Sequence, residues 1–524
     1  GTPIVGVCAA GILVRGVAPM LVDKLNEPAV ISVPDDGSTV IPLLGGHRGA
    51  NRLARQIANG LKSHASITTA GDIAMGVALD EPPIGYRLQN FKDAKPVMAS
   101  LLNGSTVRVS GENIFDINSS PSAEITLVVS EAPMIGDEMT LVSHPQKYAL
   151  GLGCARGCSI DEMWDLVSKC LLDSNIAAGS ISSIGSLDLK GDEPAMIETA
   201  TRLGVPFRLF EANELESLTP KLANPSEVVF AEVGCHGVSE AAALALSGGS
   251  LVVEKKKTAN ATCAIAKSDN VIIEMNGRSR GKLSIIGIGP GQHSWRTPEA
   301  SALVAEAEEL VGYGLYIDIL GPLAVGKDRS DFPLGGEEAR CRYALEQAGK
   351  GKNVALICSG DAGIYAMGAL VFELLDRNEN EMGVSDAAKR IEVQCAPGVS
   401  ALQGAAARAG APLGHDFCTI SLSDLLTPRE DIIRRLHAAA EGDFVIAFYN
   451  PVSKTRRTLL AEAREILLKY RPDDTPVMLA SSLGRPEEEV RYRRLDELEV
   501  DEVDMLTVVL IGSSNSRLAN LGEG

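Results

Sequence analysis

Residues 283–291 read LSIIGIGPG, so an apolar run passes directly into a turn of glycines and one proline. The apolar run predicts a buried β-strand, and the glycines predict a tight turn whose backbone could approach a ligand closely. Thr297 and Pro298 then predict a helix start, because Thr caps helices and Pro loses no hydrogen bond at the first helical position. Apolar residues between 300 and 311 share one helical face. This order of elements predicts an α/β fold.

The glycine turn does not have the dinucleotide-binding pattern Gly-x-Gly-x-x-Gly. The third glycine of that pattern would fall at Gln292, and Pro290 has no backbone amide for a phosphate. A nicotinamide-dependent oxidoreductase is therefore disfavoured, and a purely structural turn explains the motif alone equally well.

Three later segments repeat the pattern of an apolar strand that ends in small residues. They are residues 354–365 (VALICSGDAGIY), 391–401 (IEVQCAPGVSA) and 445–451 (VIAFYNP). Ligands of open parallel sheets lie at the carboxyl ends of the strands, where these loops would meet. Asp361 would place a carboxylate there beside bare backbone, which suits ribose hydroxyls or a cationic centre. The four loops together predict a ligand cleft, which a purely structural protein would not need.

Length and composition limit the class of protein. The 524 residues predict three to four domains, and the 45% hydrophobic content excludes wholesale disorder. The net charge of −19 disfavours nucleic-acid binding, although a local pocket could still bind a small anion. No apolar run approaches the ~20 residues that span a bilayer, so no membrane segment is expected. The ten scattered cysteines predict a reducing, cytoplasmic location.

The clearest predicted boundary lies at residues 276–282 (NGRSRGK), whose composition predicts a linker between two separately built halves. Softer breaks are expected near residues 143–146 and 69–72. The predicted domains are residues 1–72 with a truncated start, 73–145, 146–268 and 281–518, the last with an internal break near 396–416. Both halves alternate strand-like and helical patterns, which predicts a multidomain α/β protein.

The four loops, together with residues 311–316 (VGYGLY), 414–424 (GHDFCTISLSD) and 509–514 (VLIGSS), resemble the tetrapyrrole methylase family. The resemblance covers roughly residues 281–518 and is strongest to members that methylate carbon 17 of precorrin-3B. It implies two α/β lobes, S-adenosyl-L-methionine bound between them, methyl transfer with ring contraction, and a homodimer. Methylation at carbon 11 or 20, or of another substrate such as diphthine, remains an alternative.

The resemblance and the chemistry together suggest three sets of site residues. The cofactor contacts that the family resemblance implies are Gly287, Gly289, Pro290, Gly291, Gly360, Asp361, Gly363, Ile364, Tyr365, Ser400, Ala401, Tyr449, Asn450 and Thr507. The candidate catalytic residues for proton transfer during ring contraction are His415, Asp416, Ser423 and Asp424, although each could equally cap a turn or helix. The candidate cations for substrate carboxylates are Lys327, Arg329, Arg429, Lys454 and Arg456, although a solvated surface explains such residues as well.

The first half resembles the cobalt-precorrin-5A hydrolase family (cobalamin biosynthesis protein G). The segments that carry the likeness are residues 10–15, 43–54 (LLGGHRGANRLA), 151–158 (GLGCARGC), 186–190 (SLDLK), 238–244 (VSEAAAL) and 257–266 (KTANATCAIA). The likeness implies either a second, hydrolytic activity on a tetrapyrrole or a module that only binds and transfers one, with other corrin-pathway enzymes as potential partners. His47 and Arg48, in a strand-to-helix loop, are its candidate substrate-binding residues, and an ordinary turn explains them equally well.

The cysteines of this half do not predict a metal site. Cys154 and Cys158, with Cys235 and His236, lack the paired spacing of a structural zinc site. Buried cysteines in small-residue packing are the better interpretation, and no metal is expected.

Overall fold

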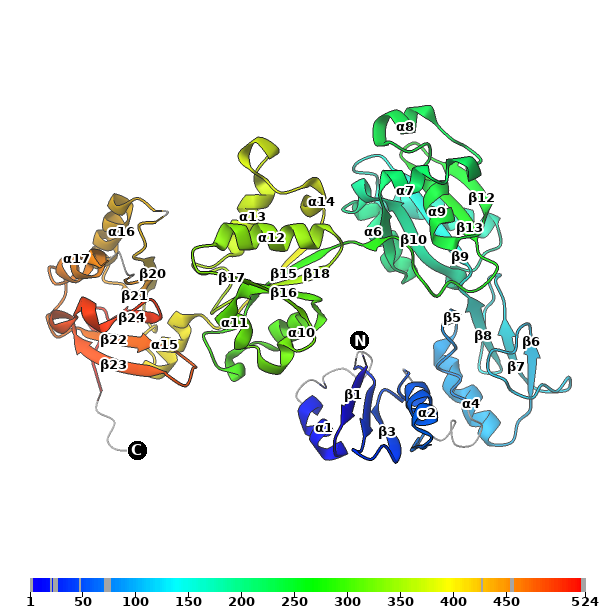
Figure 1. The fold of residues 1–524 in the computed structure, drawn as a ribbon, viewed down its shortest axis with the longest axis horizontal. Helices are drawn as coiled ribbons and strands as arrows, with labels where there is room; N and C mark the ends of the chain where they lie inside the picture. The colour runs from blue at the N-terminus through cyan, green and yellow to red at the C-terminus, as the bar shows by residue number, and fades with distance from the viewer. Residues whose placement is uncertain are drawn as a thin grey trace. The chain divides into compact units, whose positions relative to one another are not determined.

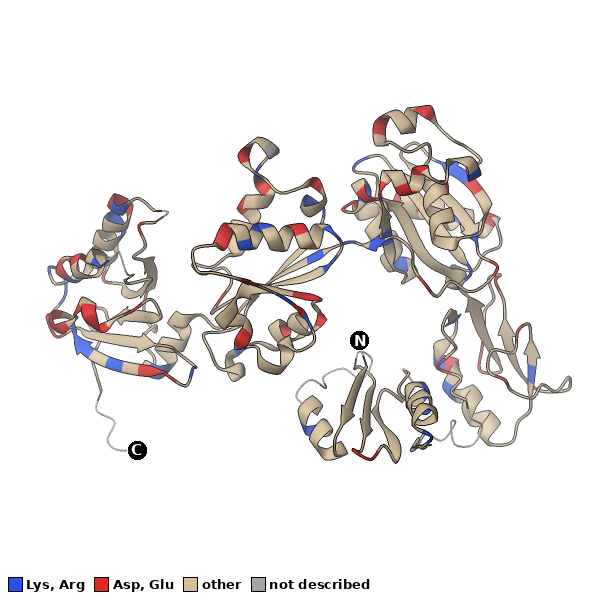
Figure 2. Ribbon diagram, viewed as in Figure 1, with Lys and Arg blue, Asp and Glu red and all other residues tan. Residues whose placement is uncertain are grey.

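The chain folds into two compact units, Gly1–Ser279 and Arg280–Gly524. The structure is a computed structural model that describes residues 3–18, 21, 27–46, 49–69, 77–425, 427–452 and 457–519. Figure 1 shows that each unit is built from separate α/β parts. Acidic and basic residues are interspersed along both units (Figure 2). No helix in these ranges is long and apolar enough to cross a membrane.

The first unit begins with a small mixed sheet of order β1-β2-β3-β4. Its elements are β1 (Ile4–Val7), α1 (Ala10–Val17), β2 (Val30–Val33), β3 (Thr39–Leu44), α2 (Ala50–Leu61) and β4 (His64–Ala65). A second sheet has the order β5-β8-β7-β6. Its elements are β5 (Tyr86–Leu88), α4 (Ala94–Leu102), β6 (Val107–Ser110), β7 (Ile125–Val129) and β8 (Thr140–Pro145).

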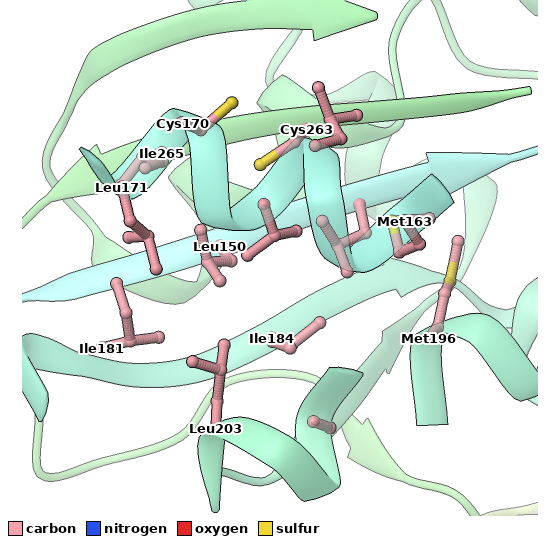
Figure 3. Packing of buried hydrophobic residues seen from close by; sticks show 14 of the residues in the cluster. Leu150, Met163, Cys170, Leu171, Ile181, Ile184, Met196, Leu203, Cys263 and Ile265 are labelled. Carbon is pink, nitrogen blue, oxygen red and sulfur yellow. The ribbon is translucent and has the colours of Figure 1, made fainter. Parts of the chain in front are cut away.

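The third part of this unit is a sheet of order β12-β13-β9-β10-β11-β14. Its strands are β9 (Tyr148–Cys154), β10 (Ile181–Leu187), β11 (Phe207–Phe210), β12 (Ser250–Lys257), β13 (Ala261–Lys267) and β14 (Arg278–Ser279), and its helices are α5 (Ile160–Asp173), α6 (Pro194–Leu203), α7 (Ala212–Glu216), α8 (Glu227–Val233) and α9 (Ser239–Ser247). The side chains of α5 and α6 pack with Leu150, Ile184 and Cys263 of the sheet into one buried core (Figure 3). Helix α9 packs directly on β9, since a Cβ on Gly151 would lie 1.7 Å from the Ser239 oxygen.

The second unit contains two sheets. The first is fully parallel, with the order β17-β16-β18-β15-β19. Its elements are β15 (Lys282–Gly287), α10 (Pro298–Glu306), β16 (Glu309–Tyr313), α11 (Gly314–Asp318), β17 (Asp328–Phe332), α12 (Glu337–Gly349), β18 (Asn353–Cys358), α13 (Gly368–Asp376), α14 (Asp386–Lys389) and β19 (Glu392–Ala396). The predicted cap of α10 is present, because Thr297 Oγ1 accepts a hydrogen bond from the Ala300 amide at 3.1 Å.

The second sheet of this unit is mixed, with the order β20-β21-β24-β22-β23. Its elements are α15 (Ala401–Ala409), β20 (Phe417–Ser421), α16 (Arg429–Glu441), β21 (Val445–Tyr449), α17 (Thr458–Leu467), β22 (Pro476–Ser481), β23 (Glu489–Arg494) and β24 (Thr507–Ile511). Strands β20 and β21 are parallel, whereas β24 runs antiparallel to β21 and to β22. The end of β21 and the start of β24 therefore lie at the same edge.

Two local predictions differ from the structure. The helix expected through residue 311 ends at Glu306, and Leu310 and Val311 belong to β16. Short apolar runs satisfy both helical and strand patterns, and pairing with β18 decides for the strand. The segment expected as a linker is partly ordered, because Leu209 pairs with Arg278 and β15 begins at Lys282. A mixed α/β, multidomain fold is confirmed.

Candidate functional site

The second unit contains a cavity at the edge where its strand-end loops meet. Its volume is about 780 Å³, including the part that is open to solvent. The loops after β18 and β19 line one side, and residues at the end of β21 and the start of β24 line the other. This placement at the carboxyl ends of parallel strands is the usual location of ligands in α/β sheets.

Glycines allow the loops on the first sheet to contact one another. Gly289 and Gly360 exchange two backbone hydrogen bonds, with N–O distances of 3.1 and 2.8 Å. A Cβ on Gly398 would lie 2.1 Å from the carbonyl oxygen of Gly360 and 2.7 Å from the backbone of Gly287. Gly287 and Gly398 therefore permit the close approach of one loop to another, a role that the sequence did not indicate.

Asp361 presents its carboxylate to the cavity in a fixed orientation. Its Oδ1 accepts a hydrogen bond from the Gly363 amide at 2.8 Å, and its Oδ2 accepts one from the Gly398 amide at 3.1 Å. Each carboxylate oxygen can accept a second hydrogen bond. Asp361 thus joins two loops and can still bind a ligand hydroxyl or cation.

Two tyrosines extend the cavity wall from one sheet to the other. The ring centroids of Tyr365 and Tyr449 are 5.1 Å apart. The Tyr365 hydroxyl donates to the Thr419 carbonyl at 2.9 Å, and the Tyr449 hydroxyl accepts from the Leu402 amide at 2.9 Å. Burial raises the pKa of Tyr449, so this side chain is a neutral phenol at physiological pH.

The cavity also concentrates unusual backbone conformations. Tyr365, Asn450 and Ser482 have φ values of 50°, 51° and 48°, and all three line the cavity. Left-handed conformations of residues other than glycine cost about 1–3 kcal/mol each and cluster at ligand sites. Asn tolerates this region, whereas Tyr and Ser seldom adopt it. The surrounding structure therefore imposes these conformations.

Sequence reasoning missed the loop that follows β22. Residues 482–485 (SLGR) continue the same pattern of an apolar strand ending in small residues, so the signal was present in the sequence. Arg485 lines the cavity beside Tyr316 of α11 and donates from Nε to the Pro290 carbonyl at 3.3 Å. Within the described part of the chain, Arg485 forms no ion pair.

Most of the predicted cofactor residues lie around this one cavity. Those that line it are Pro290, Gly360, Asp361, Ile364, Tyr365, Ser400, Ala401, Tyr449, Asn450 and Thr507. The others, Gly287, Gly289, Gly291 and Gly363, do not line it. A Cβ on Gly291 would lie 2.6 Å from the Leu483 carbonyl, so this glycine permits contact with the loop after β22.

The structure separates the predicted catalytic residues into two pairs. His415 and Asp416 precede β20 and are exposed, whereas Ser423 and Asp424 follow β20 and are half-buried. The cavity lies near the end of β21, and Tyr449 at that end pairs with Ser421 at the end of β20. A strand of five residues spans roughly 16 Å. His415 and Asp416 are therefore at the far edge of the sheet, because parallel pairing with β21 fixes the direction of β20.

The described candidate cations have partners within the protein. Lys327 donates from Nζ to the carbonyls of Ala305 and Ala307 at 2.7 Å each, at the end of α10. Arg329 pairs with Asp318 and Asp331 at 2.6 Å each. Arg429 pairs with Glu462. None of the three lines the cavity. Lys454, Arg456, His47 and Arg48 lie outside the described residues.

Cys154 and Cys158 of the first unit are protonated thiols. Burial raises the pKa of Cys154 to about 12 and also raises the pKa of Cys158. In the ranges that the structure covers, no group of three or more His, Cys, Asp or Glu side chains is arranged to hold a metal ion.

Comparison with known families identifies both units. The family model "Tetrapyrrole (Corrin/Porphyrin) Methylases" matches residues 282–499, and the models "Cobalamin synthesis G N-terminal" and "Cobalamin synthesis G C-terminus" match residues 1–72 and 148–266. The chain belongs to the tetrapyrrole methylase family through its second unit, and parts of its first unit match the two cobalamin synthesis G models. The resemblance inferred from the sequence motifs is confirmed.

Individual proteins are similar to parts of this chain. A precorrin-3B C(17)-methyltransferase from Sinorhizobium is 42% identical over 242 residues, which cover 45% of this chain and 91% of the relative. A cobalt-factor III methyltransferase from Priestia megaterium is 43% identical over 239 residues, 45% of this chain, and this match spans only 43% of that relative. The crystal structure of the methyltransferase CobJ is 37% identical, with a TM-score of 0.43, over 46% of this chain and 97% of that one.

Proposed function

We propose that this chain is an S-adenosylmethionine-dependent methyltransferase that methylates carbon 17 of precorrin-3B, or of its cobalt-containing counterpart, and contracts the ring. The observation that carries the proposal is the cavity of the second unit, which gathers loops from both of its sheets. The 42% identity to a precorrin-3B C(17)-methyltransferase supports the choice of carbon 17.

The residues around the cavity fit S-adenosylmethionine. This cofactor combines an apolar adenine, ribose hydroxyls, a sulfonium cation and a carboxylate. Ile364 and Leu483 provide apolar contacts, Asp361 accepts from hydroxyls or faces the cation, and Arg485 is available for the carboxylate.

The contribution of the chain is mainly orientation. S-adenosylmethionine supplies an electrophilic methyl group when bound, and the substrate carbon supplies the nucleophile. Asp361 is held by two backbone amides and Tyr449 by the Leu402 amide, so neither must reorganise when ligands bind. Fixed placement of reacting groups is one of the largest contributions to catalysis of a two-substrate reaction. Ser423 and Asp424, at the cavity end of β20, are the better placed candidates for proton transfer during ring contraction.

Calorimetry with S-adenosylhomocysteine tests the cofactor site. The parent chain is expected to bind one equivalent, and Asp361→Asn is expected to bind more weakly because one carboxylate oxygen is replaced by a donor. Glu392→Gln is a matched control, because Glu392 is exposed on the edge strand β19 and does not line the cavity. Equal affinity in all three proteins would contradict the role of Asp361, and no binding to the parent would contradict the cofactor site.

The position of methylation separates the proposed reaction from its alternative. The enzyme is supplied with ¹³C-methyl-labelled S-adenosylmethionine and precorrin-3B or its cobalt counterpart, and the product is examined by NMR. A labelled methyl group on carbon 17 of a contracted ring supports the proposal. A label on carbon 11 or 20 would assign the chain to another reaction of the family.

We further propose that the first unit is a hydrolase-like module that acts on, or holds, a later tetrapyrrole of the same pathway. The cobalamin synthesis G domains support this proposal. Tethering two sites raises the effective concentration of an unstable intermediate at the second site. Loss of the two-carbon fragment from cobalt-precorrin-5A on incubation with the full chain would indicate turnover, and unchanged substrate would limit the unit to binding.

A homodimer formed through the second unit and a cytoplasmic location complete the proposal. The homodimer is supported by the usual dimeric state of methylases in this family. The cytoplasmic location is supported by the cysteines, which form no disulfide among the described residues. Light scattering of the purified chain at micromolar concentration tests the dimer, and a monomeric mass would contradict it.

A further inference from the structure

The first unit contains a cavity of its own. Its volume is about 780 Å³, including the part open to solvent. Its walls come from β5 and β8 of the second sheet, and from α5, α6 and the segment 177–179 beside the third sheet. Among the described residues the lining includes Arg87, Arg202 and His144 but no Asp or Glu. A cationic cavity is notable in a chain whose net charge is −19.

Arg87 carries a positive charge that the protein does not neutralise. Its Nη1 and Nη2 donate to the carbonyls of Leu203 and Gly204 at 2.7 Å each, at the end of α6. Carbonyl oxygens orient the guanidinium but leave its net charge in place, and no described carboxylate forms an ion pair with it. Burial lowers the pKa of Arg87, which reflects the cost of desolvating this charge. A bound anion would recover part of that cost.

An aromatic ring orients the guanidinium group of Arg202 at the cavity. Its guanidinium lies over the indole of Trp164, 5.3 Å from the ring centroid. Its Nε donates to Glu198 Oε1 at 3.0 Å, one turn earlier on α6, and this leaves both Nη groups for another acceptor. Stacking and the Nε contact reduce the rotamer freedom that a bound anion would otherwise have to remove.

His144 contributes polarity without charge. It is only 3% exposed, and its Nδ1 lies 2.7 Å from the Ser130 carbonyl. Because a carbonyl only accepts, Nδ1 carries the proton. Burial and the nearby charge of Arg87 lower the pKa of His144, so the ring is neutral at pH 7. Both charged lining residues are therefore arginines: Arg87 has no ion-pair partner among the described residues, and Arg202 forms an ion pair with Glu198.

We propose that this cavity binds carboxylate side chains of a tetrapyrrole, so that the first unit holds the macrocycle at a site separate from the methyl-transfer cavity. The choice of a tetrapyrrole rests on the proposed function, whereas the preference for carboxylates rests on the arginines alone. Met134 lines the cavity and its neighbour Ile135 is 90% exposed, which provides an apolar surface for a large macrocycle beside the charged groups. A small inorganic anion would not use that surface.

The two tryptophans of the chain allow each unit to be followed separately. Trp164 lines the proposed site, and Trp295 lies in the second unit. In a Trp295→Phe background, uroporphyrin III, a stable octacarboxylate, is titrated while the fluorescence of Trp164 is recorded. Saturable quenching is expected. Arg202→Gln should weaken binding about tenfold, the loss expected for one charge-assisted contact, and Arg202→Lys should restore part of it.

Matched controls decide between specific and general effects. Arg108→Gln removes the same charge from the same unit, at an exposed arginine that bonds to Thr126 Oγ1 and does not line the cavity. Unchanged affinity in Arg202→Gln, or an equal loss in Arg108→Gln, would overturn the proposal. Displacement of the porphyrin by millimolar phosphate would also overturn it in favour of a general anion site. Circular dichroism verifies that each variant is folded.

The same tryptophans separate this proposal from the proposed function. In a Trp164→Phe background, the fluorescence of Trp295 reports binding of S-adenosylhomocysteine to the second unit. Loss of that signal with porphyrin binding intact would contradict the cofactor site only. The reverse pattern would contradict the anion site only.

Discussion

Replacement of Gly398 by alanine tests the central structural feature of the methyltransferase cavity, the contact of three strand-end loops. A Cβ at this position would lie 2.1 Å from the carbonyl oxygen of Gly360 and 2.7 Å from the backbone of Gly287. Both obstacles are backbone atoms at the ends of central strands, so neither can rotate away. The alanine therefore has to displace at least one of the loops that line the cavity.

The size of the effect follows from this geometry. Overpacking costs about 1–3 kcal/mol, and backbone obstacles on two sides place Gly398→Ala near 3 kcal/mol. For a unit of this size, that corresponds to a melting temperature lower by roughly 6–12 °C. Binding of S-adenosylhomocysteine should weaken by more than about tenfold, because Gly360 and Asp361 line the cavity and would move with the loop.

Gly414→Ala is the matched control. A Cβ on Gly414 would meet only the Ala411 oxygen, at an ordinary 3.6 Å. Thermal unfolding followed through Trp295, together with calorimetry, measures both variants beside the parent. If Gly398→Ala melted and bound S-adenosylhomocysteine like Gly414→Ala, the close contact of the loops would not be required and the reasoning would be refuted.

Three further variants probe other parts of the chain. Arg471 is buried and donates to the carbonyls of Gly512, Ala439 and Phe444, so Arg471→Met should destabilise the second unit by about 3 kcal/mol or more in urea unfolding; an unchanged midpoint would contradict this role. Burial alone would raise the pKa of Glu240, but hydrogen bonds from backbone and side-chain donors lower it overall. The ionised Glu240 side chain therefore stabilises the fold above the unfolded pKa of about 4.3, and this stabilisation is lost as the pH falls through the lower folded pKa. Glu240→Gln should therefore unfold more easily than the parent at pH 7, and the two proteins should become equally stable in acid. A difference in stability that does not change with pH would contradict this role. Tyr365→Phe removes one hydrogen bond between the two sheets and should weaken S-adenosylhomocysteine binding about two- to tenfold in calorimetry. An affinity equal to that of the parent would contradict a role of this hydrogen bond in binding.

The strands and loops of the second unit follow from local sequence signals. The runs that end at Gly287, Cys358, Ala396 and Tyr449 are strands, and each is followed by a loop at the cavity edge. Apolar residues followed by Gly, Pro or Asn determine these elements within a few residues, so no distant contact is needed to predict them. The family also follows from these loops, because their order along the chain is a property of the sequence.

The position of the catalytic candidates depended on strand direction. The motif that contains His415 and Asp416 was predicted as one site with Ser423 and Asp424. Strand β20 separates the two pairs, because its parallel register with β21 places only its end near Tyr449. Register and direction come from hydrogen bonds between segments distant in sequence, which no local pattern specifies.

By itself, the sequence determined the α/β elements, the strand-end loops, the family of the second unit and the resemblance of the first unit to cobalamin synthesis G proteins. Only the tertiary structure showed that glycines 287, 360 and 398 hold loops against one another, and that Tyr365, Asn450 and Ser482 adopt left-handed conformations around one cavity. It also showed Arg485 at the methyltransferase cavity and two arginines in a cavity of the first unit. The physical reason is that local preferences select helices, strands and turns, whereas the packing of distant segments decides which side chains meet and which charges remain without a partner.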